Sequence, residues 1–289
     1  MTGQGTDTWL TETLYPGYGQ SFEISNTLYR EKTAHQDLAI YETPALGRVL
    51  VLDDVVQTTE VDEFYYHEMM AHLPILAHGD ARRVLIIGGG DGGALREVLK
   101  HSNVDHATMV EIDASVVELC REHLPAISAG AFDDPRTRLI IADGTKFVAE
   151  SGENFDIVII DSTDPIGPSV ALFEQSFYRD CHDILGSHGI LIRQAGVPFF
   201  QADVYTTAYA RLTAIFRDCA LALVPVPTYS GGHMALAWAS DDPDHRNILT
   251  DTIDKRFAAA KIETRYYNPD MHRSAFALPA FMNAALGLD

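Results

Sequence analysis

Residues 84–98 read VLIIGGGDGGALREV and decide the fold of this chain. An apolar run leads into a cluster of glycines and then a helix-like segment, which is typical of the strand, turn and helix of a nucleotide-binding fold. Gly88, Gly90 and Gly93 match the G-x-G-x-x-G turn of dinucleotide-binding proteins. Asp91 lies within that turn, where backbone amides usually bind phosphate. Because a carboxylate repels phosphate, we expect the turn to bind a different kind of ligand.

From residue 82 onward, short apolar runs alternate with helix-like segments. The apolar runs are RVLIIGG (83–89), HATMVEID (106–113), RLIIADG (138–144), FDIVIIDSTDP (155–165) and GILIRQAG (189–196). The segments between them include GALREVLKH (93–101), ASVVELCREHL (114–124) and SFYRDCHDIL (176–185). This alternation predicts an α/β fold with a mostly parallel sheet covered on both faces. The later runs at 220–229 and 233–240 are expected to form an antiparallel pair at its edge.

The first 60 residues have a different pattern, with short β-rich runs separated by turn residues. We expect a small antiparallel β domain over residues 1–60 and a catalytic domain over residues 61–289. The segment at the junction, residues 58–79, is predicted to be helical. Pro74 within it is expected to break the helix.

The chain carries 41 acidic and 21 basic side chains, giving a formal net charge of −20. This charge disfavours a nucleic-acid or anionic-membrane partner and is compatible with a small cationic ligand, but by itself it is better explained by an acidic surface that maintains solubility. No apolar run reaches the ~20 residues of a membrane span. The first residues also lack the features of a signal peptide. We therefore expect a cytoplasmic protein without a membrane partner.

The cysteine and histidine patterns give no indication of a metal site. Cys120, Cys181 and Cys219 are widely spaced and odd in number, so we expect reduced thiols rather than disulfides or a thiolate metal centre. His67 and His72 in HEMMAH are five residues apart, whereas the zinc-protease pattern places its histidines at i and i+4.

The first four apolar runs of the predicted sheet each end in, or are closely followed by, at least one carboxylate. In open α/β sheets ligands bind beyond the carboxyl ends of the strands, so these acids are candidates for one site. Glu111 follows the glycine turn by about 20 residues, where an acid accepts ribose hydroxyls in nucleotide folds. Asp143 and Gly144 form a similar turn suited to an adenine edge. A structural role for Glu111, as a strand-end or helix-first-turn acid, is the alternative.

The acids of DSTDPIGP, residues 161–168, form the second group. Asp161 and Asp164 flank a turn stiffened by Pro165 and Pro168, so both side chains can face a cavity. An Asp before Pro often only caps a turn, and that remains the alternative for Asp164. For the pair at the end of a strand, a functional role is favoured.

The charge of Asp91 discriminates among nucleotide ligands. A nicotinamide dinucleotide would place its pyrophosphate against the carboxylate, which disfavours it. S-adenosylmethionine has no phosphate, but its own carboxylate would lie near the turn. Decarboxylated S-adenosylmethionine lacks that anion and ends in an ammonium group that Asp91 can pair with. Asp91 is then a selector for this donor.

Several motifs together resemble those of the spermidine synthases, the polyamine aminopropyltransferases, over residues 10–280. They are GGGDGGALREV (88–98), VEID (110–113), ADGTKF (142–147), DSTDPIGP (161–168), QTTEVDEFYYHEMM (57–70) and PTYSGG (227–232). The resemblance implies a Rossmann-like sheet of the S-adenosylmethionine methyltransferase type preceded by a small antiparallel β domain. It also implies a homodimer or homotetramer. The implied reaction transfers the aminopropyl group of decarboxylated S-adenosylmethionine to putrescine, giving spermidine and 5′-methylthioadenosine without a cofactor or metal.

The same resemblance assigns roles to individual positions. Asp161 is implied to be the catalytic proton acceptor and, with Tyr66, Asp164 and Tyr229, to bind putrescine. The implied donor-binding residues are Gln36, His67, Asp91, Glu111, Asp143 and Gly144. Two positions depart from the usual pattern. His67 is Gln in some members, and Asp54 replaces a Gly found in many, a change that Asp tolerates if the turn needs a positive φ.

Two alternatives remain open. One is an S-adenosylmethionine-dependent amine N-methyltransferase on the same fold, which Asp91 disfavours. The other is a catalytically silent polyamine-binding protein, which would not need Asp161. The sequence also does not fix the acceptor, since putrescine, cadaverine and longer amines differ only in length.

Overall fold

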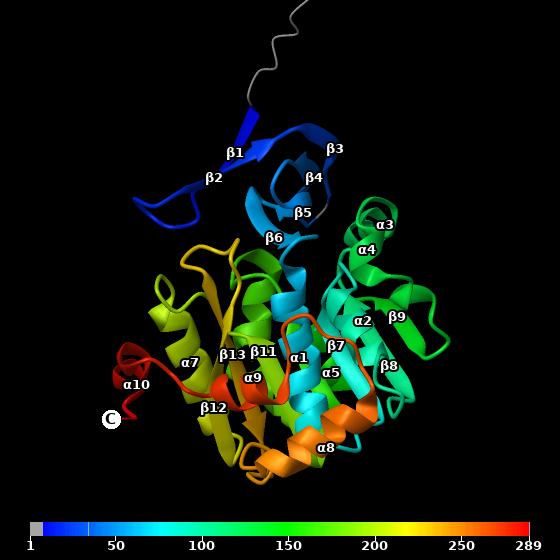
Figure 1. Ribbon diagram of the computed structural model, residues 1–289, viewed down its shortest axis with the longest axis vertical. Coiled ribbons are helices and arrows are strands. Elements are labelled where there is room, and N and C mark those ends of the chain that lie inside the picture. Colours follow the sequence, from blue (N-terminus) through cyan, green and yellow to red (C-terminus); the bar gives the residue numbers. More distant parts are fainter. Residues whose placement is uncertain (1–7, 34, 289) are drawn as a thin grey trace, which may run out of the picture.

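The computed structural model describes residues 8–33 and 35–288, which form a larger sheet covered by helices and two smaller sheets at one end of it (Figure 1). A two-stranded sheet pairs β1 (Thr8–Glu12) with β2 (Gln20–Ile24). A four-stranded antiparallel sheet follows in the order β3 (Asn26–Lys32), β4 (Asp37–Thr43), β5 (Gly47–Leu52) and β6 (Val55–Thr59). Within these residues, no helix has both the length and the apolar character that a bilayer span requires.

The larger sheet has seven strands in the order β12-β13-β11-β10-β7-β8-β9. Five strands are parallel: β7 (Arg83–Gly88), β8 (His106–Glu111), β9 (Thr137–Ile141), β10 (Phe155–Asp161) and β11 (Leu185–Gln194). The antiparallel strands β13 (His233–Ser240) and β12 (Asp218–Pro225) complete one edge. The predicted α/β class, the parallel sheet and its antiparallel edge pair are therefore confirmed.

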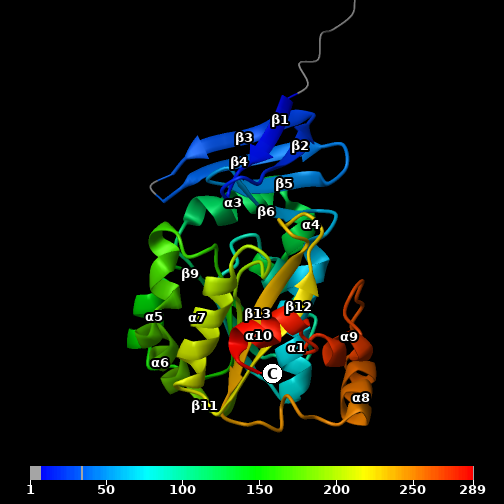
Figure 2. The same cartoon turned by 90° about the vertical axis from the view of Figure 1, so that its left-hand side faces the viewer.

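Helices cover both faces of this sheet (Figure 2). One face carries α1 (Glu63–His78), α2 (Gly93–Leu99) and α8 (Thr250–Ala260), with α9 (Pro269–Ser274) beside α8. The other face carries α5 (Gly144–Glu150), α6 (Gln175–Ile184), α7 (Ala202–Thr213) and α10 (Ala280–Leu286). Because side chains alternate along a strand, Ile157 and Ile159 of β10 pack under α1, whereas Val158 and Ile160 pack on the opposite face. Both faces of the sheet are buried, as the continuous apolar runs predict.

The four-stranded sheet is joined to the larger unit by a separate apolar cluster. Leu38, Ile40 and Leu50 pack against residues of α3 (Ala114–His123) and α4 (Pro125–Ser128). A short 3-10 helix, η1 (Ala131–Asp133), follows α4, and a second, η2 (Gly167–Phe173), precedes α6. The cluster holds the small sheet above the carboxyl ends of the parallel strands, where the site lies.

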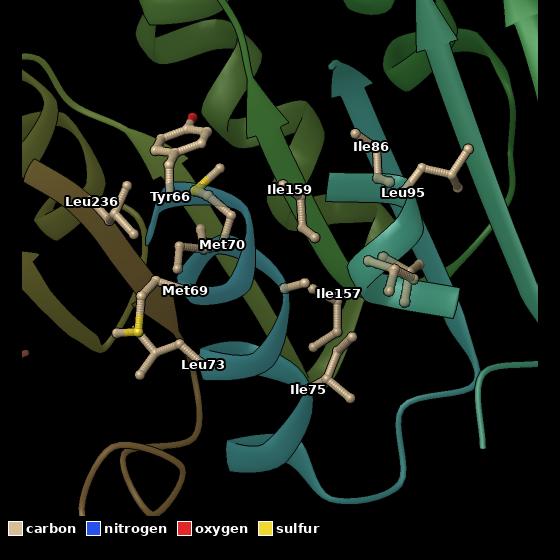
Figure 3. Packing of buried hydrophobic residues seen from close by; sticks show 14 of the residues in the cluster. Tyr66, Met69, Met70, Leu73, Ile75, Ile86, Leu95, Ile157, Ile159 and Leu236 are labelled. Carbon is tan, nitrogen blue, oxygen red and sulfur yellow. The ribbon is translucent and has the colours of Figure 1, made fainter. Parts of the chain in front are cut away.

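The expected break at Pro74 is wrong, because α1 continues through this residue to His78. Proline removes one helical hydrogen bond and costs about 3 kcal/mol in a helix interior. All residues of α1 except Tyr65 and His78 are buried, so packing outweighs this cost. Figure 3 shows Ile75 of this helix beside Ile157 of β10. The helix ends instead at Gly79, which has a φ of 84°.

Gly88 brings the ends of β7 and β10 together. It has a φ of +82°, and a Cβ atom added there would lie 2.2 Å from the carbonyl oxygen of Asp161. That same carbonyl accepts a hydrogen bond of 2.8 Å from the amide of Gly89. The turn therefore fixes the backbone of Asp161 directly.

We predict that Gly88→Ala lowers the free energy of unfolding by about 3 kcal/mol, because it combines a left-handed φ with a backbone clash. Gly130→Ala is the matched control, since Gly130 has a φ of +85° and no atom within 4 Å of an added Cβ. The control should lose only about 1 kcal/mol. Urea unfolding of both variants checks this, and equal losses would contradict the proposed close approach.

Candidate active site

A pocket of about 460 Å³ lies between the carboxyl ends of the parallel strands and the four-stranded sheet. All of the predicted site residues line it: Gln36, Tyr66, His67, Asp91, Glu111, Asp143, Gly144, Asp161, Asp164 and Tyr229. They come from the N-terminal sheet, from α1 and from the ends of strands that are far apart in sequence. The structure thus brings the predicted residues together, and their individual roles remain predictions.

Asp161 ends β10 and is partly buried in the wall of the pocket. One carboxylate oxygen accepts a hydrogen bond of 2.8 Å from the Tyr66 hydroxyl. The other oxygen is buried and has no hydrogen-bond partner among the described residues. Burial and the nearby charge of Asp91 raise the pKa of Asp161 to about 6. One oxygen of this carboxylate is thus fixed and the other is free, an arrangement that fits the predicted role of Asp161 as a base.

Asp91 is held at both of its oxygens. One accepts a hydrogen bond of 2.7 Å from the amide of Gly93, and the other lies 3.4 Å from Nε2 of His67. Burial raises the pKa of Asp91, but His67 and the Gly93 amide lower it by more, so the pKa of Asp91 is lower than its ordinary value. Asp91 is ionised at neutral pH, with one cationic neighbour already in place.

His67 connects Asp91 to a second carboxylate. Its Nδ1 lies 2.6 Å from Glu63, which in turn accepts hydrogen bonds from the guanidinium of Arg96. Burial lowers the pKa of His67, but Asp91 and Glu63 on either side raise it well above its ordinary value. The imidazole is therefore protonated and donates to both carboxylates.

The acids at the ends of β8 and β9 lie beside backbone amides. Glu111 is buried and accepts a hydrogen bond of 2.9 Å from the amide of Asp113. Burial raises its pKa to about 7. Asp143 caps α5 by accepting from the amide and hydroxyl of Thr145, and these hydrogen bonds lower its pKa. Gly144 packs closely enough that an added Cβ would lie 2.6 Å from Ile87.

Gln36 reaches this side of the pocket from the N-terminal sheet. Its amide donates to Asp113 at 3.2 Å, as does the hydroxyl of Thr33 at 2.8 Å. Asp54, the other position that departs from the family pattern, has a φ of 61°. The turn therefore does need a positive φ, and Asp occupies it without loss of the β5–β6 pairing.

At the end of the pocket away from Glu111 and Asp143 lie two further carboxylates, those of Asp164 and Glu12. Asp164 accepts a hydrogen bond of 2.8 Å from Gln201, and burial raises its pKa. Glu12 of β1 is also buried and lines the pocket, with Tyr15 nearby. Burial, Asp164 and Glu12 together raise the pKa of Tyr15. This end is therefore strongly acidic.

Sequence analysis missed Glu12 and Gln201. Glu12 is held by the amide of Val56 at 2.9 Å and the hydroxyl of Ser230 at 3.0 Å, both distant in sequence. No local motif surrounds either residue. Tyr229, which was predicted, donates its hydroxyl to the carbonyl of Gln57 at 2.6 Å.

Comparisons with known proteins give a consistent result. The family model of the spermine/spermidine synthase domain matches residues 63–248, and that of the spermidine synthase tetramerisation domain matches residues 8–60. A polyamine aminopropyltransferase of Pseudomonas syringae pv. tomato is 54% identical over 271 residues, covering 94% of this chain and 95% of the relative. One of Serratia proteamaculans is 53% identical over 277 residues, covering 96% of each.

Solved structures agree. A crystal structure of spermidine synthase in complex with the transition-state analogue AdoDATO matches with a TM-score of 0.93 and 38% identity, covering 98% of this chain and 96% of the other. The spermidine synthase of Thermotoga maritima matches with a TM-score of 0.90 and 36% identity, covering 98% and 95%.

Proposed function

Because this chain belongs to the spermine and spermidine synthase family, we propose that its pocket binds decarboxylated S-adenosylmethionine and putrescine. The chain is a polyamine aminopropyltransferase, and the products would be spermidine and 5′-methylthioadenosine. The observation that carries the choice of substrates is the set of partly buried carboxylates around the pocket. Asp91, Asp161 and Asp164 provide negative charge for a donor with a sulfonium and an ammonium group and for a diamine.

In the proposed reaction, a neutral amine nitrogen of the acceptor attacks the carbon bonded to sulfur. A C–N bond forms while the C–S bond breaks, and the sulfonium leaves as a neutral thioether. Removing a proton from an alkylammonium of pKa ~10 at pH 7 costs about 4 kcal/mol. Asp161 accepts this proton through its free oxygen. Its pKa of about 6, rather than 3.8, makes the transfer about 3 kcal/mol less unfavourable.

The neighbours of Asp161 orient the acceptor. The Tyr66 hydroxyl holds one oxygen of Asp161, which leaves the other available to the reacting amine. Asp164, fixed by Gln201, and Glu12 at the far end bind the remote ammonium group. Positioning of this kind supplies much of the acceleration in a displacement reaction.

On the donor side, we propose that Glu111 accepts the ribose hydroxyls and that Asp143 and Gly144 contact the adenine. Gln36 closes this end from the N-terminal sheet. Asp91, paired with the protonated His67, lies beside the aminopropyl group of the bound donor. Its negative charge there selects against a donor that carries a carboxylate.

We predict that kcat depends on the ionisation of Asp161. Its pKa is raised to about 6, so the base becomes protonated and inactive as the pH falls below that value. At saturating donor and acceptor, kcat should fall about tenfold per pH unit below pH 6. The raised pKa of His67 keeps it protonated across this range, so its titration does not add a second pH dependence to kcat. A kcat that stays constant down to pH 5 would contradict the assignment of Asp161 as the base.

Product analysis tests the proposed function. Purified protein is incubated with decarboxylated S-adenosylmethionine and a panel of diamines, and the products are identified by mass. We expect spermidine and 5′-methylthioadenosine from putrescine, with less product from cadaverine and longer amines. A methylated amine formed from intact S-adenosylmethionine would support the N-methyltransferase alternative. Binding without any product would support the silent polyamine-binding alternative.

Several organisational features remain proposals. The match to a tetramerisation domain supports an oligomer, and we propose a homodimer or a homotetramer. We propose domains at 1–60 and 61–289, supported by the end of β6 at Thr59 and the start of α1 at Glu63. The sulfonium is itself a good leaving group, which supports a reaction without metal or cofactor. The cytoplasmic location remains a prediction from sequence.

A further inference from the structure

Arg193 on β11 is buried completely and lies beside the site, yet none of the described carboxylates pairs with it. Its Nε donates to the carbonyl of Gln194, and one terminal nitrogen donates to the carbonyl of Leu172 at 2.7 Å and to the hydroxyl of Tyr178. The guanidinium carbon lies 3.6 Å from the ring centre of Phe173. Its other terminal nitrogen has no partner among the described residues.

A buried cation without a carboxylate partner contributes little to the stability of the fold. Transfer of a charge from water to a protein interior is costly, and an incompletely satisfied group recovers only part of that cost. Replacing a buried charge with an apolar side chain of similar volume is often neutral or stabilising. The contacts of Arg193 therefore suggest a role other than stability.

Two of these four contact partners, Leu172 and Phe173, belong to one segment, residues 162–173, which we name the covering loop. This loop follows Asp161 and contributes Asp164, Pro168 and Leu172 to the wall of the pocket. Its second half, η2, packs against α5, whose first residue is the proposed adenine contact Gly144.

The two halves of the covering loop have different anchors. In the first half, the Gln194 side chain donates to the carbonyl of Thr163 at 3.0 Å and Gln201 holds Asp164. In the second half, Arg193 holds the carbonyl of Leu172 and the ring of Phe173. The first half carries Asp164, the proposed putrescine contact. The second half packs against α5, which begins at the proposed adenine contact Gly144.

We propose that Arg193 is a positioning residue that fixes the second half of the covering loop and thereby sets the affinity for the donor. This inference rests on the proposed function. The planar guanidinium suits this task because it donates to two carbonyls in different directions while stacking on an aromatic ring. A lysine keeps the charge but cannot reproduce this set of contacts.

Kinetics of Arg193→Met test the proposal. We expect an unchanged or higher melting temperature, a donor KM raised at least tenfold, a kcat within threefold of the wild-type value and an unchanged KM for putrescine. Arg193→Lys should raise the donor KM at least threefold. Leu191→Val is the control, because Leu191 is buried two residues away on the same strand and has no group that could donate to the carbonyl of Leu172, and its donor KM should not change.

The possible outcomes are distinct. An unchanged donor KM in Arg193→Met overturns the proposal, as does an equal rise in the KM of donor and acceptor. If Arg193→Met does not fold, Arg193→Lys decides by the same donor-to-acceptor comparison. A wild-type enzyme that turns over no decarboxylated donor would overturn the proposed function itself, whereas normal wild-type turnover with unaltered variants overturns only the role of Arg193.

Discussion

Replacement of Asp161 by Asn is expected to lower kcat about 1000-fold while leaving donor affinity within a few-fold of the wild-type value. Asparagine has nearly the same shape, and its carbonyl oxygen can still accept the hydrogen bond from Tyr66. It cannot accept the proton of the attacking amine. The loss should therefore appear in the chemical step and not in binding.

Steady-state turnover and calorimetric titration of the donor measure the two effects separately. Asp156→Asn is the matched control, because Asp156 lies at the other end of β10, where it accepts hydrogen bonds from the amides of Arg82 and Arg83. It removes the same charge from the same strand without changing the pocket. An Asp161→Asn enzyme within tenfold of wild-type turnover would exclude Asp161 as the base.

Replacement of Asp91 by Asn is expected to reduce the preference for decarboxylated over intact S-adenosylmethionine by about 10- to 100-fold. A charged hydrogen bond in a buried site is worth about 1.5–3 kcal/mol, and the variant loses it for the decarboxylated donor only. The intact donor gains, because its carboxylate no longer meets a buried negative charge. Competition between the two donors in one reaction measures the ratio directly.

The same variant should also shift the pH dependence. Asp91 contributes to the raised pKa of Asp161, so its removal lowers that pKa and moves the acid limb of kcat to lower pH. Asp156→Asn again serves as the control. If the donor preference is unchanged, Asp91 is not the selector, and its role is limited to its contacts with Gly93 and His67.

Much of the site could be predicted because parallel strands end at the same edge of a sheet. Asp91, Glu111 and Asp161 follow separate apolar runs, and the topology alone brings their side chains to one pocket. The positive φ of Asp54 meets the condition that the sequence analysis set, on the ground that many members of the family it resembles have Gly at this position. These features depend on local pattern and on one topological rule.

The remaining features depend on contacts between distant parts of the chain. Pro74 lies within a helix because the surrounding side chains are buried against the sheet, which no helix-ending rule includes. Glu12 enters the pocket through partners on β6 and near Tyr229. Arg193 follows an apolar run and is expected from its type to be exposed, yet it is buried beneath the covering loop.

Calorimetry with three ligands tests most directly whether the carboxylates of the pocket select a carboxyl-free donor. Decarboxylated S-adenosylmethionine, intact S-adenosylmethionine and NAD are titrated separately into the wild-type protein. We predict tight binding of the decarboxylated donor, weaker binding of the intact donor and no measurable binding of NAD. Tight binding of NAD or of intact S-adenosylmethionine, with none for the decarboxylated donor, would contradict this account.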